Sequence, residues 1–222
     1  MQIDFWAPIK LSIEIAAISG LLAVFLGIMS ARIMVKRQSM KGRMLIETFF
    51  LLPIVLPPTV IGFLLVVIFG QRSPVGELIY TLFNQSIIFT WSAAAIASTV
   101  VAFPLMYQSA KAGFAAVDQE IEDAARVDGG SEWKVFWRIS IPLSARALLA
   151  GAILTFARAL GEFGATLMFA GNIPGKTQTM PIAIYMAFES GQSTLAWAWV
   201  GMMILMSIGM LVVVQIFQRT HS

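Results

Sequence analysis

The sequence predicts an all-α, polytopic membrane bundle of about five transmembrane helices, and three observations support this. Of the 222 residues, 58% are hydrophobic and only 12% are charged, whereas soluble domains carry about 25% charged residues. The mean hydropathy is +0.82, and the apolar residues gather into stretches long enough to cross a bilayer. One membrane domain covering residues 1–222, with a core from about 9 to 217, accounts for the chain.

Five apolar stretches are the candidate spans. A helix needs about 20 residues to cross roughly 30 Å of hydrocarbon, and each stretch reaches that length: 11–35, 45–70, 87–107, 143–170 and 196–217. A further apolar piece at 180–188 is too short to span, so we expect it to be re-entrant or interfacial. The chain has no cysteine and its only histidine is His221, which excludes thiol chemistry and histidine metal sites within the membrane.

Lysine and arginine are distributed unevenly between the predicted loops. Five follow the first span within residues 32–43, five lie within residues 111–146, and Arg219 lies in the tail. The opposite side holds only Lys10, Arg72 and Lys176. Because basic residues accumulate in cytoplasmic loops, we expect the first two groups and the C-terminus to be cytoplasmic and the N-terminus to be outside.

The stretch AGNIPGKT at 170–177 nearly fits the phosphate-binding pattern G-x-x-x-x-G-K-[ST]. A phosphate-binding loop needs a strand before it and a helix after it, so that backbone N–H groups converge on phosphate. Here a membrane span precedes the stretch, Pro181 follows it, and the charge distribution places it outside. The sequence therefore predicts a turn built from Asn, Pro and Gly and not a nucleotide site.

The cytoplasmic segment between the third and fourth spans, about 111–142, predicts two short helices at an angle. Asp118 is placed to cap the first helix, Gly129-Gly130 to end it and Ser131 to cap the second. Ala124 and Ala125 leave little side-chain bulk on one face, so a partner backbone can come close. The alternative is an amphipathic interfacial hairpin anchored by its tryptophans.

This segment also carries a family resemblance. Asp123-Ala124-Ala125, three residues, Gly129, nine residues, Ile139, one residue and Ile141-Pro142 resemble the E-A-A-x3-G-x9-I-x-L-P signature of ABC importer permeases. The resemblance implies a coupling helix that docks in a groove of a cytoplasmic ATPase. The expected coupling residues are Glu122, Asp123, Ala124, Ala125, Gly129, Ile139 and Pro142.

Three further stretches narrow the resemblance. Residues 156–166, F-A-R-A-L-G-E-F-G-A-T, are similar to molybdate and sulfate importer permeases, and residues 52–62 also fit this group. Residues 171–181 resemble the molybdate branch more closely. The resemblance implies a homodimer in a bacterial plasma membrane, with two ATPase subunits inside and a binding protein delivering molybdate or tungstate outside. ATP-Mg would sit on the ATPase, and no cofactor is expected on this chain. Sulfate or thiosulfate remains an alternative substrate, and an ion-coupled secondary transporter is an alternative class.

Charged and helix-breaking residues inside the spans point to the translocation path. Arg158 and Glu162, at i and i+4 near the bilayer centre, can pair on one helix face. The pair can hold the bundle together, or it can lie on the wall of an anion path. Prolines in span two free carbonyl groups that must be satisfied internally or face a water-filled cavity. The candidate path and gate residues are Pro53, Pro57, Pro58, Thr59, Arg158, Gly161, Glu162, Gly164 and Thr166.

Overall fold

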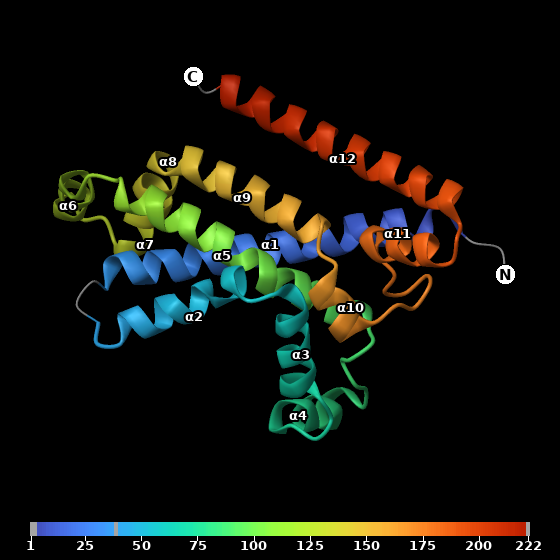
Figure 1. The fold of residues 1–222 in the computed structure, drawn as a ribbon. Coiled ribbons are helices and arrows are strands. Elements are labelled where there is room, and N and C mark those ends of the chain that lie inside the picture. The colour runs from blue at the N-terminus through green and yellow to red at the C-terminus, as the bar shows by residue number, and fades with distance from the viewer. Residues whose placement is uncertain (1–3, 38–39, 221–222) are drawn as a thin grey trace.

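The computed structural model describes residues 4–37 and 40–220, with side chains described as far as residue 212. Within this part of the chain, every regular element is a helix (Figure 1). The elements are α1 (Ala7–Lys36), α2 (Arg43–Val55), α3 (Pro58–Phe69), α4 (Pro74–Phe83), α5 (Trp91–Ala115), α6 (Gln119–Val127), α7 (Glu132–Val135), the π-helix η1 (Phe136–Ser140), α8 (Ile141–Leu143), α9 (Ala145–Leu160), α10 (Gly164–Ala170), α11 (Met180–Glu189) and α12 (Ser193–Thr220).

Helices α1, α5 and α9 form the centre of the bundle, and small residues allow them to approach closely (Figure 1). A methyl group added at Gly27 of α1 would lie 2.8 Å from the Met106 side chain of α5. One added at Gly151 of α9 would lie 2.4 Å from the Ser109 side chain of the same helix α5. Small residues serve this purpose in membranes, where dispersion contacts between helices replace the hydrophobic effect.

The helix α12 differs from α5 in how far the rest of the chain covers it. In the most apolar 18-residue window of α5, 67% of the residues are buried, against 11% in α12. Figure 1 shows α12 leaning away from the bundle, in contact with α11 near its first turns. Trp199 of α12 donates from its indole nitrogen to the carbonyl oxygen of Phe5, 3.0 Å away. The apolar surface of α12 therefore faces lipid or another chain.

The second predicted span is not one straight helix. The chain changes direction by 119° between α2 and α3. The break is formed by Leu56 and Pro57, and we call it the α2–α3 break. Leu56 and Pro57 each precede a proline, and their ψ angles are 141° and 137°. A residue before proline is forced into extended backbone by the proline Cδ, so two consecutive extended residues turn the chain aside.

The fourth predicted span is also broken. Helix α9 ends at Leu160, residues Gly161 to Phe163 form the α9–α10 break, and α10 begins at Gly164. At its other end, the segment Glu132–Leu143 meets α9 at an angle of 77°. The expectation of a continuous helix over 143–170 was therefore wrong about its interior, because residues near Glu162 leave the helical path.

Three helices are long and apolar enough to cross a membrane, or up to five if each bent pair counts as one span. The expected count of five holds on the second reading. The third span begins later than expected, at Trp91, and continues to Ala115 through the buried Pro104. The short apolar piece is helix α11, which packs against α12. The sequence did not predict α4, an amphipathic helix capped by Ser73.

Candidate coupling surface and translocation path

The predicted hairpin is present as α6, α7 and η1, and we call residues 119–140 the coupling hairpin. The Asp118 carboxylate accepts a hydrogen bond from the backbone nitrogen of Glu120 at 2.9 Å. The Ser131 hydroxyl accepts one from the nitrogen of Lys134 at 3.4 Å. Gly129 has φ +85° and lies just beyond α6, as a C-terminal glycine does. The two caps and the stop are therefore confirmed.

Helix α6 contains no buried residue and presents an open face to solvent. Ala124 and Gly129 are exposed and Ala125 is half-buried. Ile121 and Val127 add exposed apolar side chains, with Val127 at 87% exposure. A helix that buries none of its own residues gains little from packing, so this face is available to a partner.

Glu122 points the other way and joins three elements. Its Oε1 accepts hydrogen bonds from Arg32 of α1 at 2.8 Å and from the Ser140 hydroxyl of η1 at 2.5 Å. Its Oε2 lies 2.8 Å from Arg126 of α6. The side chains of Glu122 and Arg32 are 12% and 13% exposed, and the Arg32 guanidinium lies 5.4 Å from the centre of the Phe136 ring. This carboxylate therefore holds α6 onto α1.

The electrostatics of Glu122 follow from this geometry. Burial opposes ionisation of the Glu122 carboxyl, but hydrogen bonds from Ser140, Arg32 and Arg126 outweigh it and lower its pKa. Asp123, the acidic residue of the family signature, is exposed and pairs with Arg126 of its own helix. The inward acid is therefore Glu122, and Asp123 stays on the solvent side.

A second ion pair runs parallel to the first. Lys36 of α1 bonds Glu132 of α7, and Arg126 bonds the other oxygen of Glu132 at 2.9 Å. Both partners of the Lys36–Glu132 pair are about half exposed, so water screens it. From the sequence, Arg32 and Lys36 were interpreted only as orientation signals. No local sequence pattern indicates that Arg32 contacts Glu122, 90 positions away.

The two remaining coupling candidates lie on the return arm of the hairpin. Ile139 is half-buried in η1, and Pro142 is exposed at the start of α8. Trp133 and Trp137 stack edge to face with ring centroids 5.6 Å apart, and both are exposed. Within the π-helix η1, Phe136 and Ser140 are buried while Trp137 is exposed.

Inside the bundle, the two helix breaks meet. A methyl group added at Gly164, the first residue of α10, would lie 3.2 Å from Pro58 and from Thr59 of α3. One added at Gly62 would lie 2.8 Å from the carbonyl oxygen of Ala165. The path candidate Gly164 is thus a neighbour of Pro58 and Thr59, which lie more than 100 positions earlier in the sequence.

The predicted ion pair between Arg158 and Glu162 is confirmed. Nη1 of Arg158 lies 2.7 Å from Oε2 of Glu162, with side-chain exposures of 32% and 1%. The other oxygen, Oε1, accepts a hydrogen bond from the backbone nitrogen of Ala165 at 2.7 Å. The carboxylate therefore spans the α9–α10 break, with α9 on one side and α10 on the other.

The other path candidates have varied positions. Thr59 and Gly161 are exposed, and Pro53 lies within α2, half-buried. Thr166 is fully buried, and its hydroxyl has no hydrogen-bond partner among the residues that the structure describes. The structure therefore gathers most candidates around the two breaks, while Pro53 remains on the preceding helix.

The stretch AGNIPGKT forms a turn. The backbone nitrogens of Lys176, Thr177 and Gln178 all lie within hydrogen-bonding distance of the carbonyl oxygen of Ile173, at 2.9 to 3.2 Å. These amides are consumed within the loop and cannot converge on phosphate. The loop and the coupling hairpin also lie at opposite ends of the long helices (Figure 1). The nucleotide-site interpretation is thereby excluded, as the sequence predicts.

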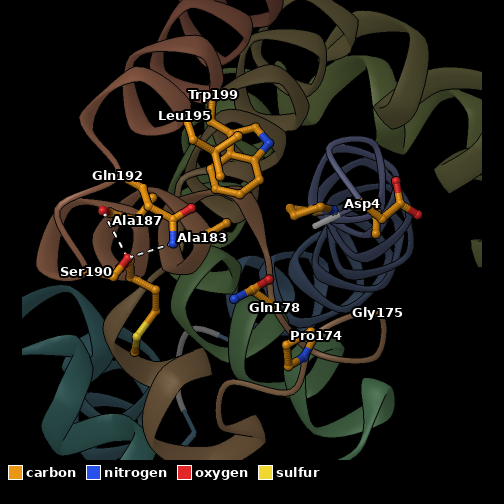
Figure 2. A pocket seen from close by; sticks show the side chains of 13 residues that line it. Asp4, Pro174, Gly175, Gln178, Ala183, Ala187, Ser190, Gln192, Leu195 and Trp199 are labelled. Atoms are coloured by element: carbon orange, nitrogen blue, oxygen red, sulfur yellow. Dashed lines mark hydrogen bonds between the residues drawn. The ribbon is translucent and has the colours of Figure 1, made fainter. Parts of the chain in front are cut away.

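This loop borders a hollow of about 370 Å³ between α1, α11 and α12. Figure 2 shows Trp199 and Leu195 of α12 on one side of the hollow and Pro174 and Gly175 of the loop on the other. Gln178 projects between them. The elements that line the hollow, α11 and the first turns of α1 and α12, lie at the end of the bundle opposite the coupling hairpin (Figure 1).

Comparisons with known proteins identify the family. The model of the binding-protein-dependent transport system inner membrane component matches residues 23–221. YvgM of Bacillus subtilis, a putative molybdenum transport system permease protein, is 56% identical over 98% of this chain and 95% of its own length. ModB of Escherichia coli (strain K12), a molybdenum transport system permease protein, is 39% identical over 83% and 80%. CysW of Synechococcus elongatus, a sulfate transport system permease protein, is 32% identical over 85% and 65%.

Solved structures share the fold at low sequence identity. An ABC transporter involved in the import of alginate has a TM-score of 0.69 and 16% identity, covering 96% of this chain and 77% of that chain. The inward facing MetNI methionine ABC transporter has a TM-score of 0.65 and 15% identity, covering 95% of each chain. The family match extends over nearly the whole sequence and the fold agrees with it. The chain therefore belongs to the family of binding-protein-dependent transport system inner membrane components.

Proposed function

We propose that this chain is the permease subunit of an ATP-driven importer of molybdate, and of the similar dianion tungstate. The relatives at 56% and 39% identity are named for molybdenum transport, while the sulfate permease is more distant at 32%. The stretch 171–181 supports the same branch. The chain supplies the path, and ATP with its magnesium ion belongs to a separate ATPase subunit.

The open face of α6 is the observation that carries this proposal. It offers small residues, Ala124 and Gly129, between exposed apolar side chains, on a helix that buries none of its own residues. A groove on an ATPase subunit would cover that face. Two copies of the chain, each with one ATPase, would form the path between them, and a binding protein would deliver the anion at the end that carries Gly175 and Gln178.

Coupling then follows the contacts of Glu122. Closure of the two ATPase subunits moves the docked hairpins, and the Arg32–Glu122 ion pair at 2.8 Å carries that movement to α1. Helix α1 packs along α5 and α9, so a displacement at the hairpin reaches the helices that precede the α9–α10 break. Arg158 offsets the negative charge of Glu162 along the path, which leaves no strong anion site to slow release.

Reconstitution into liposomes tests the proposal. We expect uptake of radiolabelled molybdate only when the chain, the ATPase and the binding protein are all present. ATP must also be supplied on the side of the membrane that carries the ATPase. Uptake by the chain alone under an ion gradient would instead indicate a secondary transporter. Sulfate uptake exceeding molybdate uptake under equal conditions would favour the sulfate alternative.

A further inference from the structure

Helices α3 and α10 contact each other from one end to the other. At their first turns, Gly164 lies against Pro58 and Thr59. In the middle, a methyl group at Gly62 would approach Ala165 Cα to 2.9 Å and Met168 Cβ to 2.7 Å. At the far end, the rings of Phe69 and Phe169 lie 5.6 Å apart. Backbone contacts this close cannot slide or open without losing their packing.

We propose that α3 and α10 (the α3–α10 pair) move as one rigid gate of the translocation path, and that Glu162 is the positioning residue that sets their angle. The pair would turn on the α2–α3 and α9–α10 breaks, which meet at its base. That the gated path carries an oxyanion rests on the proposed function. The rigid-unit claim itself rests only on the contacts within this chain.

The surface beneath the pair suits such a movement. Ala165, Phe169 and Ala170 of α10 pack in one cluster with Ala93, Ala94 and Ala97 of α5. A row of alanines has no projecting side chains, so a small displacement across it does not require interlocked groups to repack. The other half of α5 packs through larger residues, among them Met106, Tyr107 and Phe114. The first half of α5 thus contributes mostly alanines to its buried cluster, together with Val101, and the second half contributes mostly larger residues.

Glu162 connects the pair to the fixed bundle. Its buried carboxylate binds Arg158, in the last turn of α9, and the nitrogen of Ala165, in the first turn of α10. The contact with Arg158 is an ion pair whose Oε2 has no hydrogen bond among the described residues, and burial strengthens its charge attraction relative to water. This side chain thus joins α9 to α10 across the break, and a different α9–α10 angle requires these contacts to change.

A cross-link within the pair is the first test. The chain has no cysteine, so Phe69→Cys with Phe169→Cys introduces one defined pair into the assembled transporter. We expect mild oxidation, or a short reducible bis(methanethiosulfonate) reagent that bridges a wider gap than a disulfide, to cross-link the two thiols. Molybdate uptake should then stay within about twofold of the reduced sample. Loss of uptake that a reductant restores would overturn the proposal. Each single cysteine variant is the control.

Substitutions at the break are the second test. Glu162→Gln keeps an oxygen acceptor for Ala165 but loses the ion pair, and we expect molybdate transported per ATP hydrolysed to fall by about tenfold. We also expect ATP hydrolysis without binding protein to rise. The double variant Arg158→Gln/Glu162→Gln is the control. It should give a higher yield of folded transporter than Arg158→Gln alone, because it leaves no unpaired carboxylate buried.

The two possible failures can be distinguished. A merely structural ion pair would lower the yield of folded transporter and leave the ratio of transport to hydrolysis unchanged, which would remove the role given to Glu162. Wild-type transporter that takes up no molybdate would contradict the proposed function. A wild type that transports while the oxidised cross-link does not would contradict the rigid gate alone.

Discussion

The coupling hairpin and the α3–α10 pair each depend on a glutamate bound to an arginine, but the surroundings of the two pairs differ. Glu122 joins a helix with no buried residue to α1, and its own side chain is 12% exposed. Glu162 is 1% exposed and lies among helices whose backbones nearly touch. Ion pairs hold the coupling hairpin to α1. Close packing holds α3 to α10, and the Arg158–Glu162 ion pair there acts only across the α9–α10 break.

This difference predicts where substitutions act. Steric changes should be severe at the α3–α10 pair, because its contacts involve backbone atoms that cannot move aside. Charge changes should act most specifically at the hairpin, because little else holds α6 to the bundle. Each region can be tested with a matched variant from elsewhere in the same chain.

The largest effect is expected at Gly62. In Gly62→Val, the added carbons would meet the backbone of Ala165 at less than 3.0 Å, which costs about 1–3 kcal/mol or more of folding free energy. We expect a lower melting temperature in detergent and loss of uptake. Gly209→Ala on α12, where nothing described lies within 4 Å of the added methyl, is the control and should be neutral or slightly stabilising. Equal effects at both sites would refute the close packing.

Removing the charge at Glu122 should uncouple transport. Glu122→Gln leaves Arg32 without its carboxylate, and hydrogen bonds to charged groups contribute about 1.5–3 kcal/mol. We expect continued ATP hydrolysis with little molybdate uptake, measured together in liposomes. Lys36→Gln breaks the parallel but exposed pair with Glu132, which is worth about 0–1 kcal/mol, and should transport nearly normally. If Lys36→Gln uncouples as strongly, Arg32–Glu122 is not the connection.

These two regions also differ in how far the sequence predicts them. The caps and the stop of the hairpin were predicted because Asp118, Ser131 and Gly129 act on backbone groups within a few positions. The α2–α3 break has a local cause as well, in Pro57 and Pro58. Its angle of 119° still required the structure, because α3 turns to meet a partner that lies 100 positions further on.

The α9–α10 break has a weaker local signal. Gly161 and Gly164 each cost about 1 kcal/mol in a helix interior, but Glu162 favours a helix and the apolar run continues beyond both glycines, so the sequence predicted a continuous span. The helix ends at Leu160, and the buried Glu162 carboxylate then contacts Arg158 before the break and Ala165 after it. Likewise, the choice of Glu122 over Asp123 as the inward acid depends on Arg32, which periodicity within α6 cannot reveal.

A bulky residue at Gly129 separates docking from folding. Gly129 has φ +85°, and no described atom lies within 4 Å of an added Cβ. Gly129→Phe therefore costs about 1–2 kcal/mol of backbone strain but meets no obstacle within the chain. We expect reduced co-purification with the ATPase and reduced uptake. Gly191→Phe is matched in backbone, with φ +73° and the same open surroundings, and should keep both. Loss in both variants would indicate strain and not docking.

The smallest effect is a dependence of stability on pH. The pKa of Glu122 is lowered from its ordinary value of 4.5 by Ser140, Arg32 and Arg126, which outweigh the opposing effect of burial. A carboxyl with a lowered pKa stabilises the fold above its unfolded pKa and loses that contribution as the pH falls through the folded value. The difference in melting temperature between wild type and Glu122→Gln should thus be constant from about pH 7 to 5 and shrink below about 4.5. A difference that grows on acidification would mean that the ionised carboxylate destabilises the hairpin, contrary to the network around it.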